Sequence, residues 1–255
     1  MTYAFEHYID LMREFTARDL KLKYRRSILG YFWSVLNPLL MMTIFTFVFS
    51  NFFKFAIDNY PLYVICGQIL WSFFNECCAR SMGVIACNGM LIRKICIPLS
   101  VFPISSIVSS LITMCFNLLC VIIVMLVTGA NFPLTIILFF IPVFLLFIFS
   151  CGFSLALSAL ALKYKDVDHL FSVVLLAWMY ASAVFYPTEI VPETVRGFIL
   201  YNPIYIYIDF FRGVVIYGIL PSAQTILIST LFSCMSLGAG LLTFNSMKKD
   251  FILYV

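Results

Sequence analysis

The stretch ARDLKLKYRRSILGYFWSVLNPLL, residues 17–40, decides the fold because a dense basic run changes directly into an apolar tract. Residues 17–26 hold five basic residues and one acid, and residues 31–53 are 23 positions without a charged side chain. An α-helix needs about 20 apolar residues to cross the hydrocarbon core of a bilayer. The stretch therefore predicts a membrane span that begins beside a positively charged segment.

The composition extends this prediction to the whole chain. Of its 255 residues, 63% are hydrophobic and 11% are charged, whereas a soluble domain carries about 25% charged residues. Residues 95–162 form a block of 68 positions without Asp, Glu, Lys, Arg or His, which is long enough to cross more than once. Because backbone groups in lipid must be satisfied within the segment, each crossing is predicted to be a helix. The predicted fold class is an all-α integral membrane protein, with a single domain over residues 1–255.

Six spans follow from the apolar blocks and the polar breaks between them. The TGANFP turn at 128–133 divides the longest block. Thirteen of the 16 Lys and Arg residues fall in segments on the same side as the amino terminus, and positive segments stay cytoplasmic, so both termini are predicted inside. The predicted spans are about 31–53, 62–81, 101–127, 134–162, 170–186 and 224–244.

Two cytoplasmic segments have more apolar content than topology requires. Over residues 3–20, apolar side chains recur at three- and four-residue steps, which predicts an amphipathic helix along the membrane surface. This helix is either a lipid anchor or a docking surface for a cytoplasmic partner. The loop NGMLIRKICIP, 88–98, combines bulky apolar residues with Arg93 and Lys94 and is predicted to press into a partner's groove. The alternative is that the basic pair only sets topology.

The outer segment 187–222 is too apolar for an ordinary loop, yet charged residues interrupt it. Its two apolar pieces are each too short to cross the bilayer. The segment therefore predicts short re-entrant helices between spans five and six, buried in protein or lining a cavity.

Groups suited to catalysis are scarce. The two histidines are isolated in sequence, and neither HExxH nor GxSxG occurs. Residues 213–218 have the glycine spacing of a phosphate-binding loop, but Ile219 and Leu220 follow where Lys and Ser or Thr are needed. We therefore expect no catalytic site, no metal site and no cofactor bound by this chain. If the chain moves a substrate, the energy comes from another subunit.

The amphipathic leader, RDLKLKYRRSILGYFWSVLNPLL, NGMLIRKICIP and the outer FYPTEIVPE…YNPI occur in this order. Together they resemble the membrane subunit of polysaccharide ABC exporters, the ABC-2 type permeases for lipid-linked O antigen, capsule or teichoic acid. The resemblance covers essentially the whole chain. It implies a homodimer of six-span subunits in the bacterial cytoplasmic (inner) membrane, two copies of a cytoplasmic ATPase that binds ATP and Mg, and no nucleic-acid partner. One departure is Ile97-Pro98-Leu99, where the family often has aromatic-Pro-Arg.

The resemblance also implies three groups of site residues. The surface helix and the 88–98 loop would contact the ATPase through Phe5, Tyr8, Ile9, Met12, Asn88, Leu91, Ile92, Arg93, Lys94 and Pro98. The segment 21–30 would form a gate where the phosphate or pyrophosphate head group of the lipid enters, through Lys21, Lys23, Arg25, Arg26, Leu29 and Gly30. Rings on spans one and five would line the translocation path, and the candidates are Phe45, Phe49, Trp178, Tyr180, Phe185 and Tyr186.

The predicted function is therefore export of a lipid-linked polysaccharide by a transport subunit that is not itself an enzyme. A permease for a drug or a small lipid would share this fold and differ only in its substrate. A membrane-embedded glycosyl- or acyltransferase would need a catalytic His or acid cluster facing one leaflet, and the sequence shows none. Which glycan is exported stays open.

Overall fold

The computed structural model describes residues 2–23, 25, 27–52, 57–94, 97–248 and 251, and side chains within these ranges apart from those of residues 2–7, 51 and 52. Over these residues the chain is built from helices joined by turns, as the all-α prediction requires. The elements are α1 (Thr2–Lys23), α2 (Phe32–Phe52), α3 (Tyr60–Cys87), α4 (Gly89–Lys94), α5 (Val101–Thr128), η1 (Leu134–Phe139), α6 (Phe140–Lys163), α7 (Asp166–Ala181), η2 (Thr188–Ile190), α8 (Glu193–Leu200), α9 (Pro203–Val215) and α10 (Ala223–Met247).

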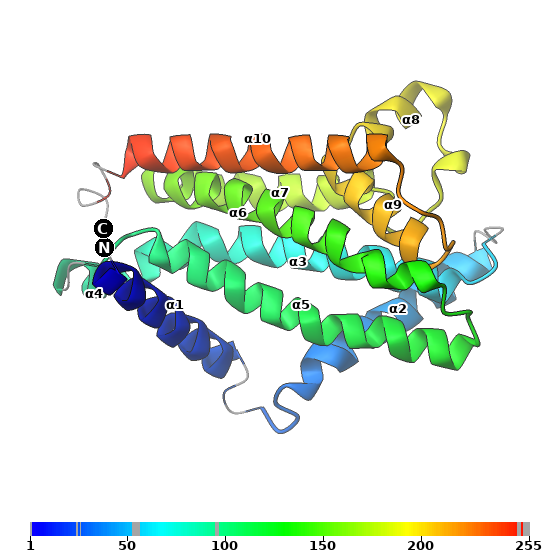
Figure 1. The fold of residues 1–255 in the computed structure, drawn as a ribbon, viewed down its shortest axis with the longest axis horizontal. Coiled ribbons are helices and arrows are strands. Elements are labelled where there is room, and N and C mark those ends of the chain that lie inside the picture. The colour runs from blue at the N-terminus through cyan, green and yellow to red at the C-terminus, as the bar shows by residue number, and fades with distance from the viewer. Residues whose placement is uncertain are drawn as a thin grey trace.

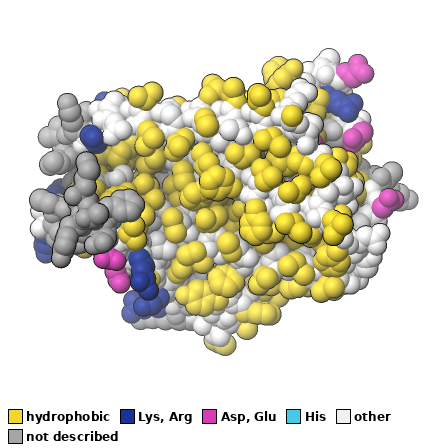
Figure 2. Space-filling view, viewed as in Figure 1, with side chains coloured by type: hydrophobic (Ala, Val, Ile, Leu, Met, Phe, Trp, Pro, Cys, Tyr) yellow, Lys and Arg dark blue, Asp and Glu magenta, His cyan; other side chains and the backbone are white. Residues whose placement is uncertain are grey.

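Five helical segments are long and apolar enough to cross a membrane. They are α2, α3, α5, η1 with α6, and α10. In Figure 1 α3, α5, α6 and α10 run along the length of the molecule, and α2 lies obliquely below them. α3 is the central helix, because 78% of its most apolar stretch is buried in the protein, against 6% for α2. Figure 2 shows apolar side chains over the middle of one face, with charged groups gathered toward its two ends. This distribution is the one that a membrane-spanning bundle needs.

The predicted fifth span, 170–186, agrees less well with the structure than the other predicted spans do. Its counterpart α7 has 16 residues and is not among the five long helices. α7 ends at Ala181 rather than at Tyr186, because the chain turns at Ser182 and Ala183 has a positive φ of 46°. The 187–222 segment holds η2 and two short helices, α8 with 8 residues and α9 with 13.

Small residues allow close packing between α6 and α10. A Cβ added to Gly152 would lie 2.2 Å from the Ser236 carbonyl oxygen, and one added to Gly240 would lie 2.0 Å from the Gly152 carbonyl oxygen. Only glycine fits at both positions, so the two backbones touch. Such small-residue contacts are common where helices associate in lipid, because close packing replaces the hydrophobic driving force.

The bundle has two chemically different ends. α1, α4, the end of α6 and the end of α10 lie toward one end, here called the basic end, whereas α8, α9 and the end of α5 lie toward the other, here called the outer end (Figure 1). Of the Lys and Arg residues that the structure describes, all but Arg196 and Arg212 lie on α1, in the turn after it, or toward the basic end of α3, α4, α6, α7 and α10.

Candidate functional site

At the basic end, the apolar face of α1 packs against its own chain. Phe15 is 9% exposed, and its ring centroid lies 5.0 Å from that of Phe102 at the start of α5. Tyr8 and Met12 pack beside it, as does α4 through Leu91 and Ile92. Two predicted coupling segments, α1 and the 88–98 loop, are therefore in contact and form one platform, here called the α1–α4 platform.

Polar contacts fix the platform to the bundle. The Tyr8 hydroxyl lies 3.3 Å from Ser100 Oγ. Arg18 donates to Asn88 Oδ1 over 3.0 Å, and Asn88 Nδ2 donates to the Val84 carbonyl oxygen over 2.7 Å. Asn88 thus joins α1 to the corner between α3 and α4.

The outward side of the platform is formed by other residues of the predicted coupling set. Ile9 is 43% exposed, and Arg93, Lys94 and Pro98 are exposed as well. A partner would meet these four side chains, whereas Tyr8 and Met12 support the platform from within. The side chain of Phe5 lies outside the described set.

An ion-pair network lies between α1 and α3. Lys23 Nζ is 2.6 Å from Glu76 Oε1, and Arg80 bridges Glu76 at 3.3 Å and Asp19 at 3.0 Å. Asp19 also pairs with Arg18 at 3.2 Å. Isolated exposed pairs contribute little to stability, but linked pairs between two elements restrict their relative movement.

The predicted gate follows this network. Lys21 and Arg25 are exposed, whereas Lys23 is held by Glu76. Gly30 has φ +50°, a left-handed conformation that glycine adopts without strain, and its N–H donates to Ser27 Oγ over 3.2 Å. Leu29 is 45% exposed in this turn. Arg26 lies outside the described residues.

At the outer end, Arg212 of α9 is 1% exposed and its guanidinium is held by backbone carbonyls. Nε and Nη2 donate to the Tyr63 carbonyl oxygen over 3.2 and 3.1 Å, Nη1 donates to Ala183 over 3.1 Å, and Nη2 donates to Val184 over 2.7 Å. Its central carbon also lies 3.4 Å from the Tyr63 ring centroid. This guanidinium, here called the Arg212 clamp, joins α9 to the start of α3 and to the turn after α7. Such contacts offset the cost of burying a charge.

Asn202 makes a second connection at this end. Its Oδ1 accepts from Trp178 Nε1 over 2.9 Å and from the Ile204 N–H over 3.0 Å, which caps α9. Its Nδ2 donates to Ala181 O and Ser182 Oγ, each over 3.0 Å. This amide therefore uses its full hydrogen-bonding capacity, which explains the YNP motif noted in the sequence.

The predicted path residues do not share one environment. Phe185 is 3% exposed and stacks on Phe45 at 4.0 Å between ring centroids, with Phe49 at 6.3 Å. Trp178 packs edge-on to Phe74 at 5.2 Å and so faces its own bundle.

The other two path candidates lie at the end of α7. Tyr180 is 55% exposed, and its carbonyl oxygen accepts a hydrogen bond from the Tyr186 hydroxyl. Of the six path candidates, Tyr180 is the most exposed. Among the residues that the structure describes, no group of three or more His, Cys, Asp or Glu side chains is placed to hold a metal ion.

Comparison with known proteins decides the family. Residues 11–216 match the ABC-2 type transporter family. The chain belongs to this family. Three relatives are similar to this ABC-2 chain over almost its whole length. The O-antigen export system permease protein RfbA of Klebsiella pneumoniae is 29% identical over 253 residues, which are 98% of this chain and 97% of the relative.

The second relative, RfbA of Myxococcus xanthus, is 26% identical and covers 96% of this chain and 95% of its own length. The polysialic acid transport protein KpsM of Escherichia coli is 22% identical and covers 91% of each chain. The expected resemblance to ABC-2 type permeases is thus confirmed.

Sequence reasoning missed two features of this ABC-2 chain. The Arg212 clamp was not predicted, because the acceptors of Arg212 are carbonyl groups, which leave no trace in residue type. The link from Asp19 to Arg80 was also missed, since the two residues are far apart in sequence. Glu76 and Arg80, four residues apart on α3, form an ion pair at 3.3 Å, with the acid first as the i,i+4 spacing favours.

Proposed function

We propose that this chain is the permease subunit of an ATP-driven exporter that moves a lipid-linked polysaccharide across the bacterial cytoplasmic membrane. The observation that carries this proposal is the similarity over almost the whole chain to two O-antigen export permeases and a polysialic acid transport protein. ATP and Mg would be bound by a separate ATPase subunit, and the chain itself would bind no cofactor.

The α1–α4 platform supports the assignment of an ATPase contact. Arg93 and Lys94 are exposed in the last turn of α4, and Ile9 of α1 is exposed as well. Closure of two ATPase subunits would push on this platform. The ion-pair network would pass the displacement from α1 to α3, because Asp19 and Lys23 are bound to Arg80 and Glu76.

In the membrane we propose six crossings with both termini cytoplasmic. The basic end would face the cytoplasm, in keeping with the positive-inside rule. α7 would cross in addition to the five long helices, as the fifth crossing along the chain, but its 16 residues span only about 24 Å at 1.5 Å per residue. The turn after α7 and the short helices α8 and α9 would fill the rest of the outer leaflet as re-entrant structure, held by the Arg212 clamp.

The proposed assembly is a homodimer with two ATPase copies. α2 and α7 present exposed apolar faces, including Ile44, Phe47, Leu170 and Val173, each more than half exposed. Two subunits meeting through these faces would enclose a path that runs past Tyr180. Lys21 and Arg25 at its inner mouth would attract the anionic head group of the lipid.

The test is affinity purification of the tagged full chain from native membranes, with quantitative mass spectrometry of its partners. We expect a co-purifying ATPase at one copy per permease, and loss of that ATPase when Arg93 and Lys94 are both changed to Glu. The matched control is Arg196→Glu at the outer end, which should keep the ATPase. If the double variant retains the ATPase and still exports glycan, the platform is not the contact. If no ATPase accompanies the wild-type chain, the exporter assignment is wrong, and a membrane-embedded transferase becomes the better explanation.

A further inference from the structure

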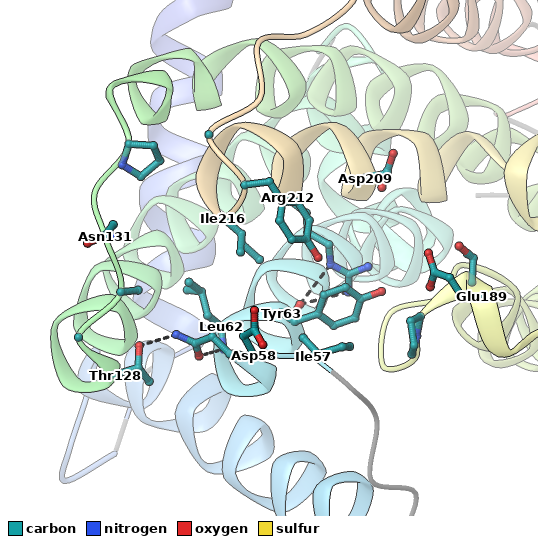
Figure 3. A pocket seen from close by; sticks show the side chains of 18 of the residues that line it. Ile57, Asp58, Leu62, Tyr63, Thr128, Asn131, Glu189, Asp209, Arg212 and Ile216 are labelled. Carbon is teal, nitrogen blue, oxygen red and sulfur yellow. Dashed lines mark hydrogen bonds between the residues drawn. The ribbon is translucent and has the colours of Figure 1, made fainter.

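A large cavity opens at the outer end, beside the Arg212 clamp (Figure 3). Its volume is about 1220 Å³. Its walls come from the link between α2 and α3, the start of α3, the turn between α5 and η1, the segment after α7, and α9. Pockets for small molecules occupy about 300–1,000 Å³, so this cavity has room for several sugar rings.

Three carboxylates lie on the cavity wall among amides and hydroxyls. Asp58, Glu189 and Asp209 come from three different segments and are all exposed in the cavity, as is Asn131 (Figure 3). Among the residues described, neither Asp58 nor Glu189 has a hydrogen-bond or ion-pair partner.

The charge balance of the wall disfavours an anionic ligand. Arg212 is the one Lys or Arg among the described lining residues, and it is 1% exposed. Its donors are already directed to the carbonyl oxygens of Tyr63, Ala183 and Val184. The wall therefore offers carboxylates without an available cation. A ligand that brings its own donors, such as sugar hydroxyls or amino groups, complements it.

An aromatic ring adds a second kind of contact. Tyr217, which follows α9, is 55% exposed and lines the cavity. Tyrosine rings pack on apolar faces and keep a polar hydroxyl, so the side chain suits a sugar ring. Tyr63, in contrast, has one ring face covered by the guanidinium of Arg212.

We propose that this outer cavity binds a segment of the exported glycan through its sugar hydroxyls, and that it accepts neutral or amino sugars in preference to acidic ones. The proposal rests on the proposed function, and it adds a glycan site within each subunit, apart from the path between subunits. The carboxylates of Glu189 and Asp209 accept hydrogen bonds from sugar hydroxyls, and Tyr217 packs on a ring face.

The test measures binding of a neutral mannose trisaccharide and of a sialic acid trimer to the full-length permease in nanodiscs, by saturation-transfer NMR. The wild-type chain should bind the neutral trisaccharide saturably and the acidic one much more weakly. The double variant Glu189→Gln with Asp209→Asn should weaken neutral binding about tenfold, since hydrogen bonds to charged groups are the stronger ones. It should also reduce the discrimination against the acidic sugar. Glu193→Gln on α8, outside the cavity, is the matched control.

Three results would overturn the proposal: no saturable binding of the neutral trisaccharide, equal binding of both sugars by the wild type, or neutral binding that the double variant leaves unchanged. Size-exclusion elution of each variant confirms that the near-isosteric amides leave the fold intact. Surface glycan in a deletion strain that carries the wild-type gene is measured in parallel. If export is not restored, the proposed function fails. If export is restored but the cavity binds no sugar, only the cavity inference fails.

Discussion

The Arg212 clamp can be tested by one methyl group on α3. An alanine Cβ at Gly67 would lie 2.5 Å from Arg212 Nη2 and 3.0 Å from the Val184 carbonyl oxygen. Unbonded heavy atoms normally approach to about 3.5 Å, so the guanidinium must move by about 1 Å. This movement breaks the bonds from Nη2 to Tyr63 and Val184, which are 3.1 and 2.7 Å long.

The expected cost follows from those two bonds. Hydrogen bonds to charged groups contribute about 1.5–3 kcal/mol each, so Gly67→Ala should lower the free energy of unfolding by about 3 kcal/mol or more. For a chain of this size, that corresponds to a fall of about 6 °C or more in the midpoint of thermal unfolding. The assay is the fraction of detergent-solubilised protein that remains monodisperse after heating, measured by size exclusion.

The matched control is Gly83→Ala on the same helix. There the nearest atom to an added Cβ is Cys87 Sγ at 3.9 Å, which is an ordinary contact. Alanine also has a higher helix propensity than glycine by about 1 kcal/mol, so G83A should be neutral or stabilising. Equal midpoints for G67A and G83A would refute the claim that the clamp is tightly packed and contributes to stability.

Two further substitutions test close packing and the capping amide. Gly152→Ala would place a Cβ 2.2 Å from the backbone of α10, so we expect a lower unfolding midpoint by the same assay, whereas Gly238→Ala meets no atom within 4 Å and should not lower it. A G152A protein as stable as G238A would show that α6 and α10 are not in contact. Asn202→Asp removes the Nδ2 donor and sets a carboxylate oxygen against two acceptor oxygens at the end of α7, with a cost of about 2 kcal/mol. An unchanged midpoint together with unchanged Trp178 fluorescence would contradict that role of the amide.

The long spans were predictable because the bilayer imposes a length and a composition on them. Predicted spans 31–53, 101–127 and 224–244 correspond closely to α2, α5 and α10, whose ends coincide with polar breaks in the sequence. α3 extends beyond its predicted 62–81, since the helix begins after the capping residue Asn59 and ends only at its C-cap, Asn88.

The end of α7 could not be predicted from composition. The apolar run continues through Phe185 while the backbone turns at Ala183. This turn is stabilised by Arg212 and Asn202, which follow it in the sequence and bind carbonyl groups near it. Backbone acceptors are the same for every residue type, so neither partner leaves a pattern that sequence reasoning can use.

The candidate site, like the fold, was predictable from the sequence only in part. That α1 is amphipathic was visible from its periodicity, but which side faces the protein was not. The structure turns Tyr8 and Met12 inward and leaves Ile9 outside. Periodicity identifies an apolar face and does not identify the surface that covers it.

α3 connects the two ends of the molecule. Near the basic end, Glu76 and Arg80 bind α1, and near the outer end Tyr63 receives the Arg212 clamp. The 13 helical steps from Tyr63 to Glu76 span about 20 Å of continuous helix. Because packed interiors transmit displacement with little compression, a push on α1 should reach the turn after α7 through this buried helix. The stability of the Arg212 clamp and the proposed coupling of α1 to export are then linked through one element. A variant that loosens the clamp is therefore expected to impair export even when it still binds the proposed ATPase.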